Sequence, residues 1–127
     1  MIHFQAIPER IALTTSLGNK AETVAANYMS AAGFKILDRN WKLPKLCEID
    51  IVAIKAGFVY FVEVKYRSNS RQGNGLDYIT TDKLRRMQRA ARAWVAMRGA
   101  AAGIRLSAIE VSGTTFTVSQ FIESIEL

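Results

Sequence analysis

The hydrophobic and polar positions along the chain follow helical spacing in two stretches. Apolar residues recur every three or four positions from 17 to 32, between a predicted N-cap at Ser16 and a stop at Gly33. The same spacing returns over residues 81–98, where it predicts these buried side chains: Leu84, Met87, Ala91, Trp94 and Val95. Two amphipathic helices are therefore expected.

Five stretches are instead rich in β-branched and aromatic residues, which favours strands. They cover residues 34–43, 47–54, 58–67, 104–111 and 115–121. The order α-β-β-β-α-β-β predicts an α/β fold with a mixed central sheet of about five strands flanked by helices. A chain of 127 residues has the size of one domain. Residues 16–127 are interpreted as that domain, and residues 1–15, which show no period, as a flexible N-terminal arm.

The second and third predicted strands are close enough to form an antiparallel hairpin. Only Lys55, Ala56 and Gly57 separate them. A two-residue loop at Ala56 and Gly57 would pair Lys55 with Phe58, and a three-residue loop would shift that pairing by one position. Alanine is a poor first residue for the favoured two-residue turns, so both registers remain open.

The register decides which charged side chains face each other. With the two-residue loop, Asp50 lies opposite Glu63 and Glu48 lies opposite Lys65, with opposed Cβ atoms about 4.5–5.5 Å apart. With the longer loop, Val62 lies opposite Asp50. Glu63 and Lys65 point to the same face in either case, because side chains alternate along a strand.

Two carboxylates that face each other among apolar residues repel strongly. A proton on one of them, or a cation between them, relieves that repulsion. Oxygen ligands suit a hard cation such as Mg²⁺ or Mn²⁺. Asp50, Glu63 and Lys65 therefore form a candidate metal-dependent catalytic site. The alternative is an ordinary cross-strand ion pair of Glu48 with Lys65 on a solvated face.

Charge is concentrated beside this candidate site. The net charge of the chain is +6, and all of it falls between Lys65 and Arg92. Such a segment is typical of a surface that meets a polyanion. A solvated arginine-rich helix face is the alternative.

Several classes of protein are disfavoured. No stretch approaches the ~20 apolar residues of a membrane span, and the first residues do not have the pattern of a signal peptide. The single cysteine, Cys47, permits no intramolecular disulfide and lacks the spacing of a zinc site. We expect a cytoplasmic protein with no membrane partner.

Residues 17 to about 111 resemble the YraN-type family of predicted endonucleases, which is similar to archaeal Holliday-junction resolvases and belongs to the PD-(D/E)xK nuclease superfamily. The resemblance rests on the following motifs: Gly18, Glu22-Thr23-Val24-Ala25, Gly33-Phe34-Lys35-Ile36-Leu37, Arg39-Asn40-Trp41, Glu48-Ile49-Asp50-Ile51-Val52, Phe61-Val62-Glu63-Val64-Lys65-Tyr66-Arg67 and Lys83. Three features depart from the family pattern: Ala21 and Cys47 stand where glycine is usual, and the stretch Arg105-Leu106-Ser107 lacks the aspartate that usually follows the arginine.

The resemblance implies that Asp50, Glu63 and Lys65 form the catalytic core, bordered by Glu48 and Arg67. It adds Glu22 as a further acidic member, although helical spacing alone favours an ordinary exposed glutamate there. The metal, Mg²⁺ or Mn²⁺, is expected on Asp50 and Glu63 with the Val64 carbonyl.

The expected reaction is hydrolysis of DNA phosphodiester bonds, with a structure-selective preference for branched or junction DNA. Lys65 is expected to orient the attacking water or to donate to the transition state. Five basic residues are expected on flanking phosphates: Arg67, Arg71, Lys83, Arg85 and Arg89. The resolvase likeness implies a homodimer. The alternatives are a non-catalytic nucleic-acid-binding protein that acts with a partner, and a ribonuclease.

Overall fold

The computed structural model describes residues 9–68, 76, 78–99 and 102–126. Its elements run in the predicted order: α1 (Glu9–Ala31), β1 (Lys35–Leu43), β2 (Cys47–Lys55), β3 (Phe58–Arg67), α2 (Thr81–Arg98), β4 (Gly103–Ser112) and β5 (Thr117–Ile122). The predicted fold class is confirmed.

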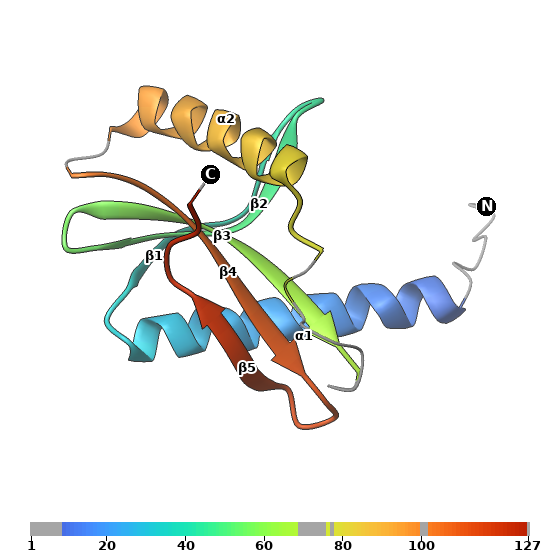
Figure 1. The fold of residues 1–127 in the computed structure, drawn as a ribbon. Coiled ribbons are helices and arrows are strands. Elements are labelled where there is room, and N and C mark those ends of the chain that lie inside the picture. Colours follow the sequence, from blue (N-terminus) through green and yellow to red (C-terminus); the bar gives the residue numbers. More distant parts are fainter. Residues whose placement is uncertain (1–8, 69–75, 77, 100–101, 127) are drawn as a thin grey trace, which may run out of the picture.

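The first helix begins earlier than its spacing suggests. α1 starts at Glu9, so the predicted N-cap at Ser16 is wrong and residues 9–15 are helical. The first turns of α1 extend beyond the sheet (Figure 1), in a stretch whose sequence shows no helical period. The rest of the predicted arm lies outside the described residues.

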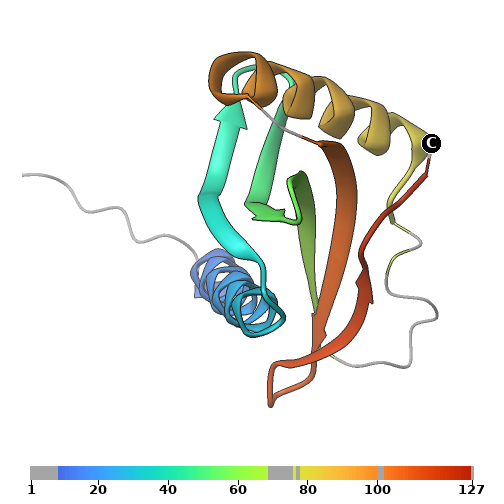
Figure 2. The same ribbon diagram turned by 90° about the vertical axis from the view of Figure 1, so that its left-hand side faces the viewer.

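The five strands form one sheet in the order β1-β2-β3-β4-β5. Neighbouring strands are antiparallel except β3 and β4, which are parallel. α2 connects these two strands, as a parallel pair requires a crossover. Figure 2 shows α1 and α2 on opposite faces of the sheet.

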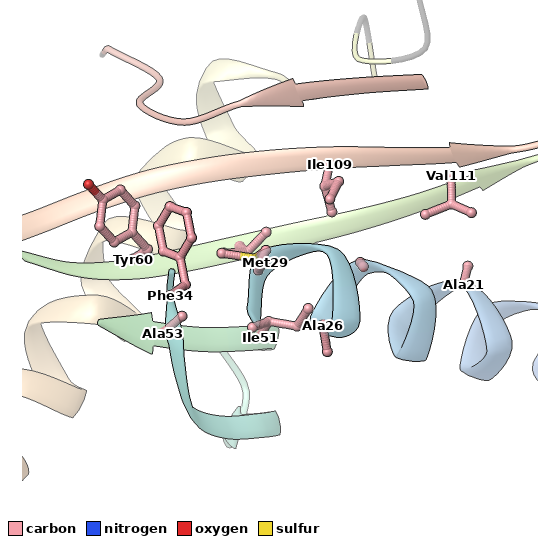
Figure 3. Packing of buried hydrophobic residues seen from close by; sticks show 11 residues of the cluster. Ala21, Ala26, Met29, Phe34, Ile51, Ala53, Tyr60, Ile109 and Val111 are labelled. Atoms are coloured by element: carbon pink, nitrogen blue, oxygen red, sulfur yellow. The ribbon is translucent and has the colours of Figure 1, made fainter. Parts of the chain in front are cut away.

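Each face of the sheet has its own core. On the α1 side, Met29 packs among inward side chains of β2, β3 and β4 such as Ile51 and Ile109 (Figure 3). Tyr28 is 43% exposed, although it belongs to the apolar helical spacing of residues 17–32, and Met29 and Ala26 are the buried side chains at this level of the helix. On the α2 side, Phe61 meets Trp94 edge to face at 5.7 Å between ring centroids.

α2 has the bounds that its pattern predicted. Thr80 caps its N-terminus, accepting a hydrogen bond of 3.1 Å from the N–H of Lys83. Its buried residues are Leu84, Met87, Ala90, Ala91 and Trp94, whereas Val95 is only partly buried. The cap fixes the position of the first turn of α2, from which Lys83 projects.

The β2–β3 hairpin has the two-residue loop. Lys55 pairs with Phe58, and both loop residues have positive φ, 52° at Ala56 and 83° at Gly57. This is the geometry of a tight turn that matches the strand twist. Alanine tolerates it although the conformation is costly for a residue with a Cβ. The register that brings Asp50 towards Glu63 is therefore the observed one.

Candidate active site

β2 and β3 separate at the site. Their paired residues run from Lys55–Phe58 to Ile51–Val62 and end there. Glu48 and Lys65 lie beyond that point, and the described residues show no ion pair between them. Asp50 and Glu63 thus face each other across strands that are moving apart.

β2 also changes its orientation at Asp50. Ile49 belongs to the core under α2 and Ile51 to the core under α1, although two residues along a regular strand share a face. On β1, Asn40 lies between the partners of Ile49 and Ile51 and has a positive φ of 52°. The irregularity in both strands turns the Asp50 side chain towards β3.

The Asp50 carboxylate takes the place of the missing strand pairing. Its Oδ2 accepts a hydrogen bond of 2.7 Å from the main-chain N–H of Val64. Burial raises the pKa of Asp50 to about 8, with the charge of Glu63 as the next cause, although the Val64 N–H lowers it. The hydrogen bond therefore fixes the orientation of the Asp50 side chain, while its surroundings disfavour the ionised form.

Glu63 lies on the face of β3 that α2 covers. Burial raises its pKa, and the ammonium of Lys83, whose Nζ is 3.2 Å from Glu63 Oε2, opposes the rise. Lys83 was expected on a DNA phosphate, but in this structure it neutralises the glutamate. Glu63 therefore has a counterion from the first turn of α2.

Lys65 follows Glu63 on the same face and is exposed. Its Nζ lies 5.3 Å from the centroid of the Tyr78 ring. Lys65 is also directly opposite Glu110 of β4 in the parallel register. Glu110 is only 6% exposed, and it brings a third carboxylate to this face of the sheet.

Sequence analysis missed Glu110, and it gave Tyr78 no role in the chemistry of the site. Glu110 stands alone between Ile109 and Val111, and a single acid in an apolar strand was the available signal. Its nearness to Lys65 depends on the β3–β4 register, which a long crossover leaves undetermined in the sequence. The sequence around Tyr78 does not place its ring over Lys65, because that position comes from the return of the chain to α2.

The two further acids approach from the edge of the site. Glu22 is half-buried on α1, and burial raises its pKa while a hydrogen bond from the Asn40 side chain lowers it. The charges of Glu48 and Glu63 raise it further, which places Glu22 within electrostatic reach of the site. Glu48 is exposed at its border.

Asp50 and Glu63 are the residues that fit a metal ion. Within the described part of the chain, no three Asp, Glu, His or Cys side chains converge closely enough to bind one by themselves. Mg²⁺ keeps several waters and is commonly bound through one or two carboxylates, whereas structural zinc needs four protein ligands. The two oxygen donors, with the Val64 backbone beside them, thus fit a hydrated hard cation.

Three arginines of α2 gather on its exposed side. Arg85, Arg86 and Arg89 line a hollow of about 490 Å³ together with Asp82. Arg85 and Arg89 were predicted to contact phosphates. Arg86, which was not predicted, lies beside them on the helix. This arginine surface (Arg85, Arg86, Arg89) continues from the helix end that carries Lys83.

The remaining predicted phosphate ligands are Arg67 and Arg71. Arg67 is largely buried and lies 3.8 Å from the Glu110 carboxylate, so it supports the site from inside. Arg71 lies outside the described residues.

A larger hollow of about 650 Å³ lies between α2, β4 and residues 124–126, and its lining includes none of the candidate site carboxylates.

The fold and site define an α/β protein whose mixed sheet separates between two strands around a carboxylate pair. The chain matches the model of the Uncharacterised protein family UPF0102 over residues 21–111, and it belongs to that family. The matched stretch contains Glu22, Asp50, Glu63 and Lys65.

Individual relatives give the same result. A UPF0102 protein of Chlorobium chlorochromatii is 36% identical over 99 residues, which cover 78% of this chain and 76% of the relative. One of Leifsonia xyli subsp. xyli is 38% identical over 96 residues, covering 75% and 80%. One of Lachnoclostridium phytofermentans is 48% identical over 75 residues, covering 59% of this chain and 63% of the relative. Among the described residues, no helix is long and apolar enough to cross a membrane.

Proposed function

We propose that this protein is a metal-dependent nuclease that hydrolyses phosphodiester bonds in DNA, with a preference for branched or junction forms. The observation that carries the proposal is the juxtaposition of Asp50 and Glu63, two largely buried carboxylates whose pKa values are both raised. A proton on one carboxylate or a cation between the two relieves the repulsion in such a pair. Sites of this kind are characteristic of function rather than of stability.

Mg²⁺ or Mn²⁺, when bound, would supply charge neutralisation at the phosphate and acidify a water molecule. Asp50 and Glu63 would hold it, with Asp50 fixed by the Val64 N–H. The fixed aspartate loses little freedom on binding, because its orientation is set before the ligand arrives.

Lys65 would act on the phosphodiester. It is exposed, and it projects from the same face of β3 as Glu63. Its ammonium can orient the attacking water or donate to the oxygen on which negative charge develops. Glu22, at the edge of the site, would accept a hydrogen bond from a water molecule there.

The arginine surface of α2 would bind the flanking phosphates. Arg85, Arg86 and Arg89 are exposed and line one hollow. Contacts of arginine with phosphates position a nucleic acid without reading its sequence. We therefore propose weak sequence preference, and a homodimer where two strands of a junction are cut.

A second candidate is a nucleic-acid-binding protein of the same fold without turnover. The ion pair of Lys83 with Glu63 supports it, because the glutamate already has a counterion. The arginine surface would serve this function equally well.

Cleavage of a matched panel of single-stranded, duplex, flap and four-way-junction DNA tests the proposal. Wild type and Glu63→Ala are assayed with Mn²⁺ and with EDTA. Metal-dependent cleavage by the wild type alone is the expected result. Tight binding of one branched form with no cleavage would favour the second candidate, and cleavage that survives in Glu63→Ala would remove Glu63 from the mechanism.

A further inference from the structure

Tyr78 lies over the candidate site from a fixed position. The N–H of Ile79 donates to the carbonyl of Leu76 at 3.1 Å, and Thr80 caps α2 directly afterwards. This turn holds the Tyr78 ring beneath the Lys65 ammonium, 5.3 Å from its centroid. The same short segment continues to Lys83, which contacts Glu63. Residues on both sides of the Thr80 cap therefore face the carboxylates.

The Tyr78 hydroxyl is buried and has no hydrogen-bond partner among the described residues. Burial raises the pKa of Tyr78, and the charges of Glu63, Asp50 and Glu110 raise it further. The hydroxyl is thus a hydrogen-bond donor in the neighbourhood of three carboxylates, yet it bonds to none of them. Buried hydroxyls without partners are rare in native proteins, and each one needs an explanation.

Each of the three carboxylates already has a partner on one of its oxygens. Glu110 Oε1 accepts a hydrogen bond of 2.7 Å from Ser119, whereas its Oε2, 3.8 Å from Arg67, accepts no hydrogen bond among the described residues. Asp50 accepts a hydrogen bond from the Val64 N–H, and Glu63 forms a salt bridge with Lys83. None of these contacts involves the Tyr78 hydroxyl, which is therefore left as a donor for an acceptor on a bound ligand.

Lys65 defines the chemistry of that acceptor. No hydrogen bond or salt bridge of Lys65 is found within the described part of the chain, and its ammonium and the Tyr78 ring are in contact. Two donors side by side, one of them cationic, favour an anionic oxygen. A non-bridging phosphate oxygen meets this requirement.

We propose that Tyr78 is a catalytic residue whose hydroxyl donates a hydrogen bond to a non-bridging oxygen of the bound phosphodiester, beside Lys65. The inference rests on the proposed function in taking a nucleic-acid phosphodiester as the ligand. The hydroxyl keeps its proton throughout, and its hydrogen bond stabilises the negative charge of the phosphoryl group.

Tyr78→Phe tests this directly, because it removes the oxygen and keeps the ring over Lys65. Tyr60→Phe is the matched control: Tyr60 is buried on the α1 face, and its hydroxyl has a partner, Glu123, at 3.4 Å. Affinity is measured by fluorescence anisotropy with a labelled four-way junction and a labelled duplex, in Ca²⁺ without cleavage. Thermal unfolding without ligand and steady-state cleavage with Mn²⁺ complete the set.

Tyr78→Phe should weaken binding and lower kcat, by roughly tenfold each, the scale of a hydrogen bond to a charged group. Its unfolding temperature without ligand should equal or exceed that of the wild type, because the substitution removes an unpartnered buried hydroxyl. Tyr60→Phe should bind and cleave like the wild type and unfold at a lower temperature.

Wild-type affinity and turnover in Tyr78→Phe would overturn the inference, as would a lower unfolding temperature with unchanged affinity. If the wild type binds DNA but cuts none, the proposed function fails, and the affinity of Tyr78→Phe alone decides this inference. If the wild type binds neither DNA, the inference fails as well, because a nucleic-acid phosphodiester is then not the ligand.

Discussion

The Oδ2 atom of Asp50 accepts a hydrogen bond of 2.7 Å from the main-chain N–H of Val64. This contact joins two strands at the point where their pairing ends. It replaces a main-chain bond with one to a carboxylate, and it holds that carboxylate near Glu63. The geometry that positions a candidate metal ligand is thus also the geometry that opens the sheet.

The first prediction concerns pH. Asp50 ionises near 3.8 in an unfolded chain and near 8 in the folded protein. Between these values the folded state binds more protons, so the free energy of unfolding falls as the pH rises. Asp50→Asn, which retains an acceptor for Val64, should remove this fall. In EDTA it should be more stable than the wild type by about 2–4 kcal/mol at about pH 9, and about equally stable at about pH 5.

Urea unfolding at the two pH values provides the measurement. Asp38→Asn is a control with the same chemical change outside the site. It weakens the contacts of Asp38 with Trp94 and Arg98, so it should lower stability. A wild-type stability that does not fall between the two pH values would contradict the electrostatic description of Asp50.

The second prediction concerns the counterion of Glu63. Lys83→Met removes the ammonium 3.2 Å from the carboxylate and should destabilise the metal-free protein by about 1–3 kcal/mol. Mn²⁺ should then raise the unfolding temperature of the variant more than that of the wild type, because it no longer competes with a lysine. Thermal unfolding with and without Mn²⁺ measures both effects. An equal rise in both proteins would show that Lys83 and the metal do not share Glu63.

The third prediction concerns salt. If Arg85 and Arg89 contact phosphates, the double variant Arg85→Ala/Arg89→Ala should reduce the slope of log affinity against log salt by about 1–2. DNA affinity is measured at several salt concentrations. Arg98→Ala is the control, because Arg98 lies in the last turn of α2 and pairs with Asp38 at 2.8 Å. Equal slopes in all three proteins would exclude the arginine surface from DNA contact.

The fourth prediction concerns the β2–β3 loop. Ala56 adopts a φ of 52° before Gly57, a position at which asparagine is favoured. Ala56→Asn should stabilise the protein by about 0.5–1 kcal/mol, and the β-branched Ala56→Val should destabilise it by a similar or larger amount. Urea unfolding measures the stability of both variants. If Ala56→Val were more stable than Ala56→Asn, the turn assignment would be contradicted.

Local sequence signals predicted the elements that depend on local physics. α2 could be predicted because its apolar residues keep a helical spacing along its whole length. The hairpin register could be narrowed to two alternatives by counting from Ala56 and Gly57. Only the structure chose between them, since the cost of a positive φ at alanine is small beside the burial of two strands.

The remainder of the site depends on contacts between distant parts of the chain. Glu110 reaches Lys65 through a parallel pairing across the whole of α2, and Lys83 reaches Glu63 from the helix cap. A sequence pattern cannot place such partners, because it carries no information on how far a crossover shifts one strand against another. The separation of β2 from β3 at Asp50 was also missed, since a regular ladder was assumed there.

Calorimetric titration of Mn²⁺ into the wild type, Asp50→Asn and Glu63→Gln tests the central claim most directly. That claim is that Asp50 and Glu63 together form a cation site where β2 leaves β3. We predict one bound Mn²⁺ per wild-type chain, with affinity lost in both variants and retained in Asp38→Asn. Binding of Mn²⁺ that is unchanged in Asp50→Asn and Glu63→Gln, or absent from the wild type, would contradict the claim.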